Sequence, residues 1–205
     1  MRRIPWWALA SAGAAPVLLV GGWTAAAARQ PRGYDPIRDT ISALAARGAT
    51  DRWVMTTALA GLGVCHVLTA AGLAPARPLG RVVLASGGVA TVLVAAFPQP
   101  VHGNSGAHTV AATAAFTALA TWPAFAAHRR GNAPLLTRRV SASASLVLLG
   151  LVVWFAAELH GGQRGLAERA AAGAQALWPL AVVVTTRRTL ARASAPVATA
   201  EGAPA

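Results

Sequence analysis

Side chains that could carry out chemistry gather in three short stretches of the sequence. They bear carboxylate, hydroxyl, imidazole or guanidinium groups, and they are Asp35, Asp39, Ser42, His102, His108, Glu158, His160, Glu168 and Arg169. The segments between these stretches are long and apolar, and ionisable groups beside such segments are costly enough to invite a functional interpretation. We predict that the fold brings most of these groups together in one polar pocket.

Two kinds of hydrolytic chemistry are compatible with these residue types. Imidazole and carboxylate groups could hold a divalent metal that activates water, with His108, His160 and Glu168 as weak candidate ligands. Alternatively, Ser42, His108 and Asp35 could act as nucleophile, base and orienting group. Either arrangement would make the protein a membrane-embedded metal-dependent or serine hydrolase that acts on a lipid or envelope substrate. No spacing motif of such enzymes is present.

A third hypothesis is a haem-based electron carrier, because two histidines that face each other at similar depth can ligate haem iron. The pairs to consider are His66 with His128 and His108 with His160. The single cysteine, Cys65, lies inside an apolar run, so an intrachain disulfide is excluded and a core position is expected.

The acidic residues also have ordinary structural roles. Asp35 would cap the start of a helix, and Asp39 and Ser42 would face water. Glu158 and Arg169 would form an ion pair that fastens two helix ends together. We favour these structural roles over catalysis.

The histidines have similar alternatives. His102 lies in a loop that contains Gly and Asn and would be solvated, while His108 would pack near the membrane interface. Only His66 lies deep in an apolar segment and no acid does, which argues against coupled ion transport. The leading hypothesis is a non-enzymatic membrane protein (structural, sensory or transport-related) with an outward-facing polar pocket. No catalytic residue is assigned and no cofactor is expected, and a small-molecule or lipid ligand fits such a pocket.

Composition places the chain in a membrane. Of its 205 residues 55% are hydrophobic and only 12% are charged, and its mean hydropathy is +0.50. Soluble domains carry about 25% charged residues. The net charge of +12 would suggest nucleic acid on a soluble domain. Here the arginines flank apolar runs instead of forming one basic face, so nucleic acid is excluded as a partner and the lipid bilayer is the expected one.

The predicted fold is all-α, a polytopic bundle of six transmembrane helices within residues 1–190. About twenty apolar residues cross the hydrocarbon core, and six segments approach that length: 4–28, 53–73, 82–97, 107–127, 140–159 and 166–186. Their continuous apolar character excludes the alternation of a barrel strand. The first segment could also be a cleaved signal peptide, but its length and its tryptophans favour a retained helix. The oligomeric state stays open.

The arginines predict the orientation. Eleven of the eighteen lie before span one, after spans two, four and six, whereas five of the six acids lie on the opposite side. By the positive-inside rule the arginine-rich side is cytoplasmic. We therefore predict a multi-pass protein of the plasma membrane with both termini in the cytoplasm. The last residues, 191–205, are predicted to form a disordered cytoplasmic tail.

The longest outer connection, residues 29–52, predicts a short amphipathic helix. Asp35 followed by Pro36 is a strong helix start, and Gly48 is a good stop. Between them an apolar face of isoleucine and leucine would turn toward the bundle. A polar face with Asp35, Asp39 and Ser42 would turn away from it.

The sequence resembles domain-of-unknown-function family 998 along essentially its whole length. Three stretches carry the resemblance: Tyr34-Asp35-Pro36 with Ile41-Ser42-Ala43-Leu44, then Phe97-Pro98 with His108, and Gly165-Leu-Ala-Glu168-Arg169. The first stretch is the most specific. The resemblance implies a multi-helix bacterial or archaeal membrane protein, and it carries over no reaction and no catalytic residues.

Overall fold

Seven α-helices make up the computed structural model, which describes residues 4–101, 103, 105–128 and 133–193. They are α1 (Trp6–Ala27), α2 (Ile41–Leu44), α3 (Trp53–Gly72), α4 (Pro78–Ala96), α5 (Gly106–Ala126), α6 (Arg138–Ala157) and α7 (Arg164–Ala193). Two short 3-10 turns, Pro134–Leu136 and Glu158–His160, flank α6. The all-α prediction is confirmed.

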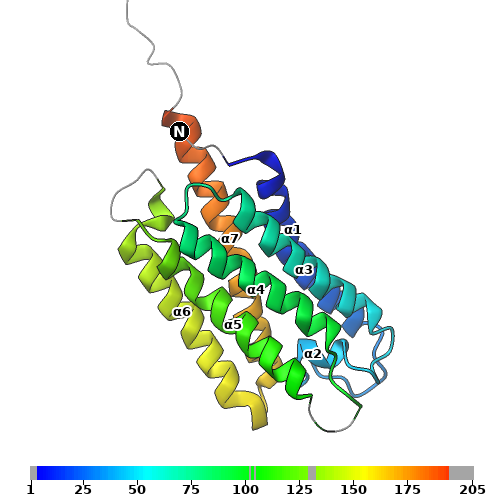
Figure 1. Cartoon of the computed structure of the whole chain (residues 1–205). Coiled ribbons are helices and arrows are strands. Elements are labelled where there is room, and N and C mark those ends of the chain that lie inside the picture. Colours follow the sequence, from blue (N-terminus) through cyan, green and yellow to red (C-terminus); the bar gives the residue numbers. More distant parts are fainter. Residues whose placement is uncertain (1–3, 102, 104, 129–132, 194–205) are drawn as a thin grey trace, which may run out of the picture.

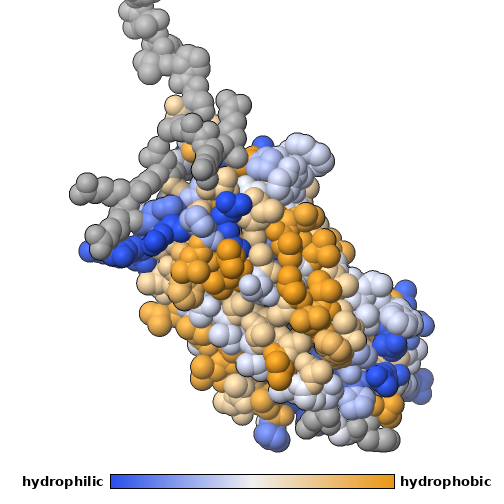
Figure 2. All heavy atoms as spheres, viewed as in Figure 1, coloured by the Kyte–Doolittle hydropathy of each residue, from blue (hydrophilic) through white to orange (hydrophobic). Residues whose placement is uncertain are grey.

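Five of these helices are long and apolar enough to cross a membrane: α1, α3, α4, α5 and α6. Their outward faces carry large apolar side chains, such as Val110 (70% exposed) and Leu146 (71% exposed). Figure 2 shows hydrophobic residues over the middle of the visible face and hydrophilic residues toward its two ends. Soluble proteins rarely expose an apolar surface of this extent to water, so the structure agrees with a lipid bilayer as the surrounding solvent.

The predicted count of six spans is not confirmed, because α7 is not among the apolar candidates. This helix is long enough at 30 residues, but it carries Glu168, Arg169 and Gln175. Two of these polar groups, Glu168 and Gln175, are buried inside the protein. A helix shielded by its neighbours can hold such groups away from lipid, which lowers its mean hydropathy.

The predicted helix bounds agree closely with the structure, with two differences. The third segment begins at Pro78, four residues earlier than predicted, because proline suits the first helical position. The last helix continues to Ala193, so residues 191–193 are helical and not part of a tail. Residues 194–205, His102 and four arginines used for the orientation (Arg2, Arg3, Arg129 and Arg130) lie outside the described residues.

Successive long helices run up and down, so the connections alternate between two ends of the bundle (Figure 1). One end holds the loop with α2, the α4–α5 connection and the α6–α7 connection, and we call it the outer end. At the opposite end, the Arg81 guanidinium donates to the carbonyls of Ala70 (2.8 Å) and Ala71 (2.6 Å), which caps the last turn of α3.

Small residues set the spacing of the central helices. A Cβ on Gly63 would lie 2.5 Å from the carbonyl oxygen of Gly88, and one on Gly88 would lie 2.6 Å from that of Gly63. The backbones of α3 and α4 therefore touch, as small residues allow in lipid. Cys65 lies in the adjoining core, as predicted. By contrast, only 22% of the most apolar stretch of α6 is buried inside the protein, so this helix lies at the periphery of the bundle.

Candidate functional site

The helix in the outer loop is shorter than predicted: it begins at Ile41, and its N-cap is Thr40 instead of Asp35. Thr40 Oγ1 accepts a hydrogen bond from the Ala43 amide (3.1 Å), and helix α2 ends at Leu44. Asp35 instead forms a turn, in which its Oδ1 accepts from the Ile37 amide (2.8 Å). Short polar side chains that bond nearby amides compete with the helix in this way.

The amphipathic pattern of the loop holds only for α2. Ile41 and Leu44 are 2% and 1% exposed, whereas Ile37 is 50% exposed. Asp39 does not simply face water either, because its Oδ2 accepts from the Asp35 amide (2.9 Å). The two aspartates thus close a turn that leads the chain into α2.

Glu168 joins the loop to α7. Its side chain is buried, with 4% of its surface exposed. One carboxylate oxygen accepts from the Ile41 amide, and the other accepts from the Ser42 hydroxyl at 3.0 Å. Hydrogen bonds to a charged acceptor are among the strongest in proteins. The carboxylate therefore holds the first turn of α2 against α7. The prediction that Ser42 faces water is wrong, because its hydroxyl bonds Glu168.

Arg169, the next residue, hydrogen-bonds the part of the loop that precedes α2. Its Nη1 donates to the carbonyls of Pro36 and Asp39, both at 2.8 Å, and its Nη2 donates to the Tyr34 hydroxyl. Burial raises the pKa of Tyr34 above its usual value, while the neighbouring Arg169 guanidinium acts in the opposite direction. The neutral phenol thus accepts a hydrogen bond from a cation.

The first turn of α7 adds further contacts to the loop. The Leu166 amide donates to the Ile37 carbonyl (3.0 Å), and Arg164 Nε donates to the Arg38 carbonyl (2.7 Å). A Cβ on Gly165 would lie 2.7 Å from the Pro36 carbonyl oxygen, so only glycine permits this approach. We call the contacts of residues 164–169 with residues 34–42 the loop clamp.

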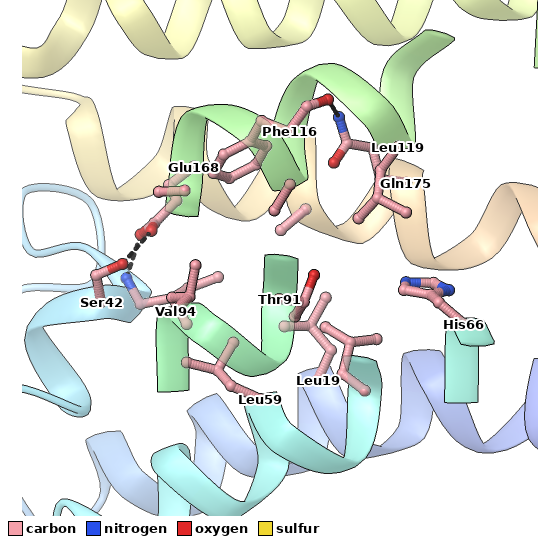
Figure 3. A pocket seen from close by; sticks show the side chains of 15 residues that line it. Leu19, Ser42, Leu59, His66, Thr91, Val94, Phe116, Leu119, Glu168 and Gln175 are labelled. Atoms are coloured by element: carbon pink, nitrogen blue, oxygen red, sulfur yellow. Dashed lines mark hydrogen bonds between the residues drawn. The ribbon is translucent and has the colours of Figure 1, made fainter. Parts of the chain in front are cut away.

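A narrow, largely apolar cavity of about 50 Å³ lies beneath the loop clamp. Figure 3 shows Glu168 and Ser42 at one end and His66 at the other, with Leu19, Leu59, Val94 and Thr91 between them. The remaining lining residues are Ile41, Leu62, Ala112, Ala115, Phe116, Leu119, Ala172 and Gln175. Every long helix except α6 contributes to this wall, and α2 closes the outer end.

The polar groups at the inner end were mostly missed in the sequence. Gln175 is 1% exposed and its Nε2 donates to the Phe116 carbonyl at 3.0 Å (Figure 3). Thr91 donates to the Gly87 carbonyl at 2.8 Å. His66 is 1% exposed, and neither ring nitrogen has a hydrogen-bond partner in the structure. A glutamine inside an apolar segment is a signal that could have drawn attention to α7.

A second cavity of about 270 Å³ lies between α5 and α6. It shares Ser42, Ala112, Phe116 and Glu168 with the first cavity. Its α5 side presents the threonines Thr109, Thr113 and Thr117, and its α6 side is apolar. The rings of Phe116 and Phe155 lie 5.4 Å apart between these helices. The two cavities therefore meet at the loop clamp.

His108 lines this second cavity together with Ser42 and Glu168. Its Nδ1 is hydrogen-bonded to the Phe97 carbonyl at 2.9 Å, and it is 4% exposed. The hydroxyl of Ser42 bonds Glu168 and not this imidazole. The hydrogen-bonded chain of Ser42, His108 and Asp35 that a serine hydrolase would need is therefore not formed.

Two predicted members of the cluster, Glu158 and His160, lie apart from the loop clamp. Glu158 accepts from the Gln163 amide (3.0 Å) at the α6–α7 connection, and His160 is exposed. The predicted ion pair between Glu158 and Arg169 is wrong, because the guanidinium is occupied by loop carbonyls and Tyr34.

The metal and haem hypotheses find no support in the geometry. Within the part of the chain that the structure describes, no group of three or more His, Cys, Asp or Glu side chains could hold a metal ion. His128, the proposed haem partner of His66, bonds the Pro75 carbonyl at 2.5 Å. The second proposed haem pair is not matched either, because His108 is buried and bonded to the Phe97 carbonyl whereas His160 is exposed.

The stretches that carry the sequence resemblance contact one another in the fold. Tyr34–Leu44 and Gly165–Arg169 form the two halves of the loop clamp, and His108 is bonded to Phe97. No curated protein and no solved structure matches the chain. A family model described as "Protein of unknown function (DUF998)" matches residues 13–185. The chain therefore belongs to the DUF998 family, as the motifs around the loop clamp predicted.

Proposed function

We propose that this polytopic membrane protein binds an apolar or amphiphilic small molecule in the cavity beneath its outer loop, and that it does so without catalysing a reaction. The observation that carries the proposal is the loop clamp itself. Buried charge-assisted hydrogen bonds hold a polar loop as a cover over a cavity whose wall is otherwise mostly aliphatic. Ligand sites in proteins have this composition, with few polar groups in an apolar wall.

The proposal includes six spans, with α7 as the sixth, in the plasma membrane. The even number of crossings agrees with the distribution of arginines, which favours one end of the bundle. Both termini then lie in the cytoplasm, and the loop clamp faces outward. The clamp would cover the cavity on the extracytoplasmic side, where a ligand from the outer leaflet or the envelope can reach it.

Binding is favoured over hydrolysis because the reactive groups are already engaged. The Ser42 hydroxyl donates a hydrogen bond to Glu168, and Glu168 also accepts a hydrogen bond from the Ile41 amide. A hydrolytic serine needs a base to accept its proton, and a base needs a free lone pair. Here the carboxylate and the hydroxyl hold the loop in place.

The second cavity supports a route from the bilayer. It lies between α5 and α6 and shares Phe116 with the first cavity. Of the five apolar candidate helices, α6 is the least buried. Hydroxyls on one wall and aliphatic carbons on the other match a molecule with both characters. We therefore propose an amphiphile that enters from the lipid.

Photolabelling of membranes that contain the protein tests the proposal, with dodecanol bearing a diazirine as the probe. We expect saturable labelling of cavity residues. Ala115→Trp should abolish it, because Ala115 lines the cavity. Ala114→Trp is the matched control, because Ala114 is exposed on the outward face of the same helix. Equal labelling of cavity residues in both variants, or none in the wild type, would contradict the proposed function.

A further inference from the structure

His66 is a buried imidazole that has no hydrogen-bond partner. It lies in α3, about 20 Å along the helix from its outer start. Only 1% of its surface is exposed, and Nδ1 and Nε2 are both buried and without a partner. Buried polar side chains are almost always hydrogen-bonded, so each exception calls for an explanation.

The other polar side chains in the cavity wall do not supply that partner. Thr91 donates to the Gly87 carbonyl in its own helix, and Gln175 donates to the Phe116 carbonyl across to α5. Glu168 and Ser42 bond each other at the opposite end of the cavity. Figure 3 shows this separation, with Glu168 and Ser42 at one end of the cavity and His66 at the other.

Helix packing fixes His66 in this position. The backbones of α3 and α4 touch at Gly63 and Gly88, one turn away from His66. A Cβ on Gly88 would lie only 3.0 Å from the Cβ of His66. The backbone and Cβ of His66 are therefore held beside the cavity by a tight helix pair.

We propose that His66 hydrogen-bonds the hydroxyl group of a neutral, elongated, apolar alcohol bound in this cavity. This inference rests on the proposed function and specifies its ligand. A neutral imidazole offers one donor and one acceptor, on different ring nitrogens. A hydroxyl group can pair with either one, accepting from the N–H or donating to the bare nitrogen.

The rest of the wall fits the apolar part of the molecule. Leu19, Leu59, Leu62 and Leu119 line the space between the two ends. Glu168 and Gln175 are seven residues apart on α7, which places the polar outer end about 10 Å from the inner one along that helix. A charged group at the inner end would lack a counter-charge among the lining residues and would be costly to bury. The ligand is therefore neutral where it meets His66.

Competition photolabelling in membranes tests this inference, with diazirine-bearing dodecanol and dodecane as probes. In the wild type we expect dodecanol to bind about fivefold more tightly than dodecane, the worth of one buried hydrogen bond. His66→Phe should remove that preference and leave dodecane binding in place. His66→Gln, which keeps a donor and an acceptor, should retain most of the preference. His160→Gln is the matched control at an exposed histidine.

Nitrogen NMR of the protein labelled at histidine supplies an independent readout. Saturation with dodecanol should shift the ring nitrogens of His66, and dodecane should not. If both probes label the cavity equally in the wild type and the His66 signals do not move, the inference is overturned while cavity binding stands. If neither probe labels cavity residues, the proposed function fails as well.

Discussion

Replacing Glu168 by leucine should release the outer loop without unfolding the bundle. Leucine is similar in size but accepts no hydrogen bond, so the Ile41 amide and the Ser42 hydroxyl both lose their acceptor. Ile41 is 2% exposed, which leaves its amide buried without a partner. Each such loss costs about 1–3 kcal/mol. The docked state of the loop should therefore lose about 3 kcal/mol, or roughly a hundredfold in population.

Glu168→Gln should have a smaller effect. The amide oxygen can still accept from Ile41, and the amide nitrogen can donate to the Ser42 oxygen after the hydroxyl rotates. What is lost is the charge of the acceptor, about 1 kcal/mol. The predicted order of loop stability is wild type, then Glu168→Gln, then Glu168→Leu.

Hydrogen–deuterium exchange of the detergent-solubilised protein measures this effect, because local opening governs exchange. Peptides covering residues 34–45 should exchange roughly a hundredfold faster in Glu168→Leu, and peptides from α3 and α4 should not change. Glu158→Gln is the control, because Glu158 bonds only its own connection. Unchanged exchange of the loop in Glu168→Leu would refute the clamp, and faster exchange throughout the bundle would show that Glu168 supports the whole fold.

Three further predictions concern the clamp and the helix core. Tyr34 is the single tyrosine, and burial raises its pKa. Phenolate absorbance should therefore appear only above pH 10 in the folded protein, and at a lower pH after denaturation. The contribution of Tyr34 to loop docking is complete below pH 10 and is lost as the folded phenol ionises. Gly165→Ala should speed loop exchange, since its Cβ meets the Pro36 carbonyl, whereas Gly162→Ala, with open space around it, should not. Gly88→Ala should lower the free energy of unfolding by about 1–3 kcal/mol through overpacking. Gly150→Ala, in open space within α6, should not lower it, because alanine favours the helix more than glycine does. Equal effects within either pair would contradict the packing described.

The all-α fold and most helix bounds could be predicted from hydropathy alone, because lipid requires long apolar runs with internal hydrogen bonds. The exceptions have local causes. Pro78 starts α4 early because the first helical turn needs no amide donor there. The status of α7 could not be settled by hydropathy, because its polar residues are buried against other helices.

The site could be predicted only in part. The proximity of the loop to the start of α7 was expected, and the structure brings Asp39, Ser42, Glu168 and Arg169 together. Their pairing was not expected, because Arg169 bonds backbone carbonyls, which leave no trace in side-chain patterns.

The inner half of the cavity was harder still to foresee. His66, Thr91 and Gln175 come from three helices. Only the packing of those helices, set by contacts such as Gly63 with Gly88, determines that the three side chains share one space.

On the proposed function, the clamped loop covers a cavity that holds a membrane-derived amphiphile. The most direct test of this claim is an experimental density map of the wild-type protein in native lipid, beside that of Ala115→Trp. We predict elongated non-protein density between Glu168 and His66 in the wild type, and its loss in the variant. A cavity that contains only water, or is filled by side chains, beneath a docked loop in the wild type would contradict the account.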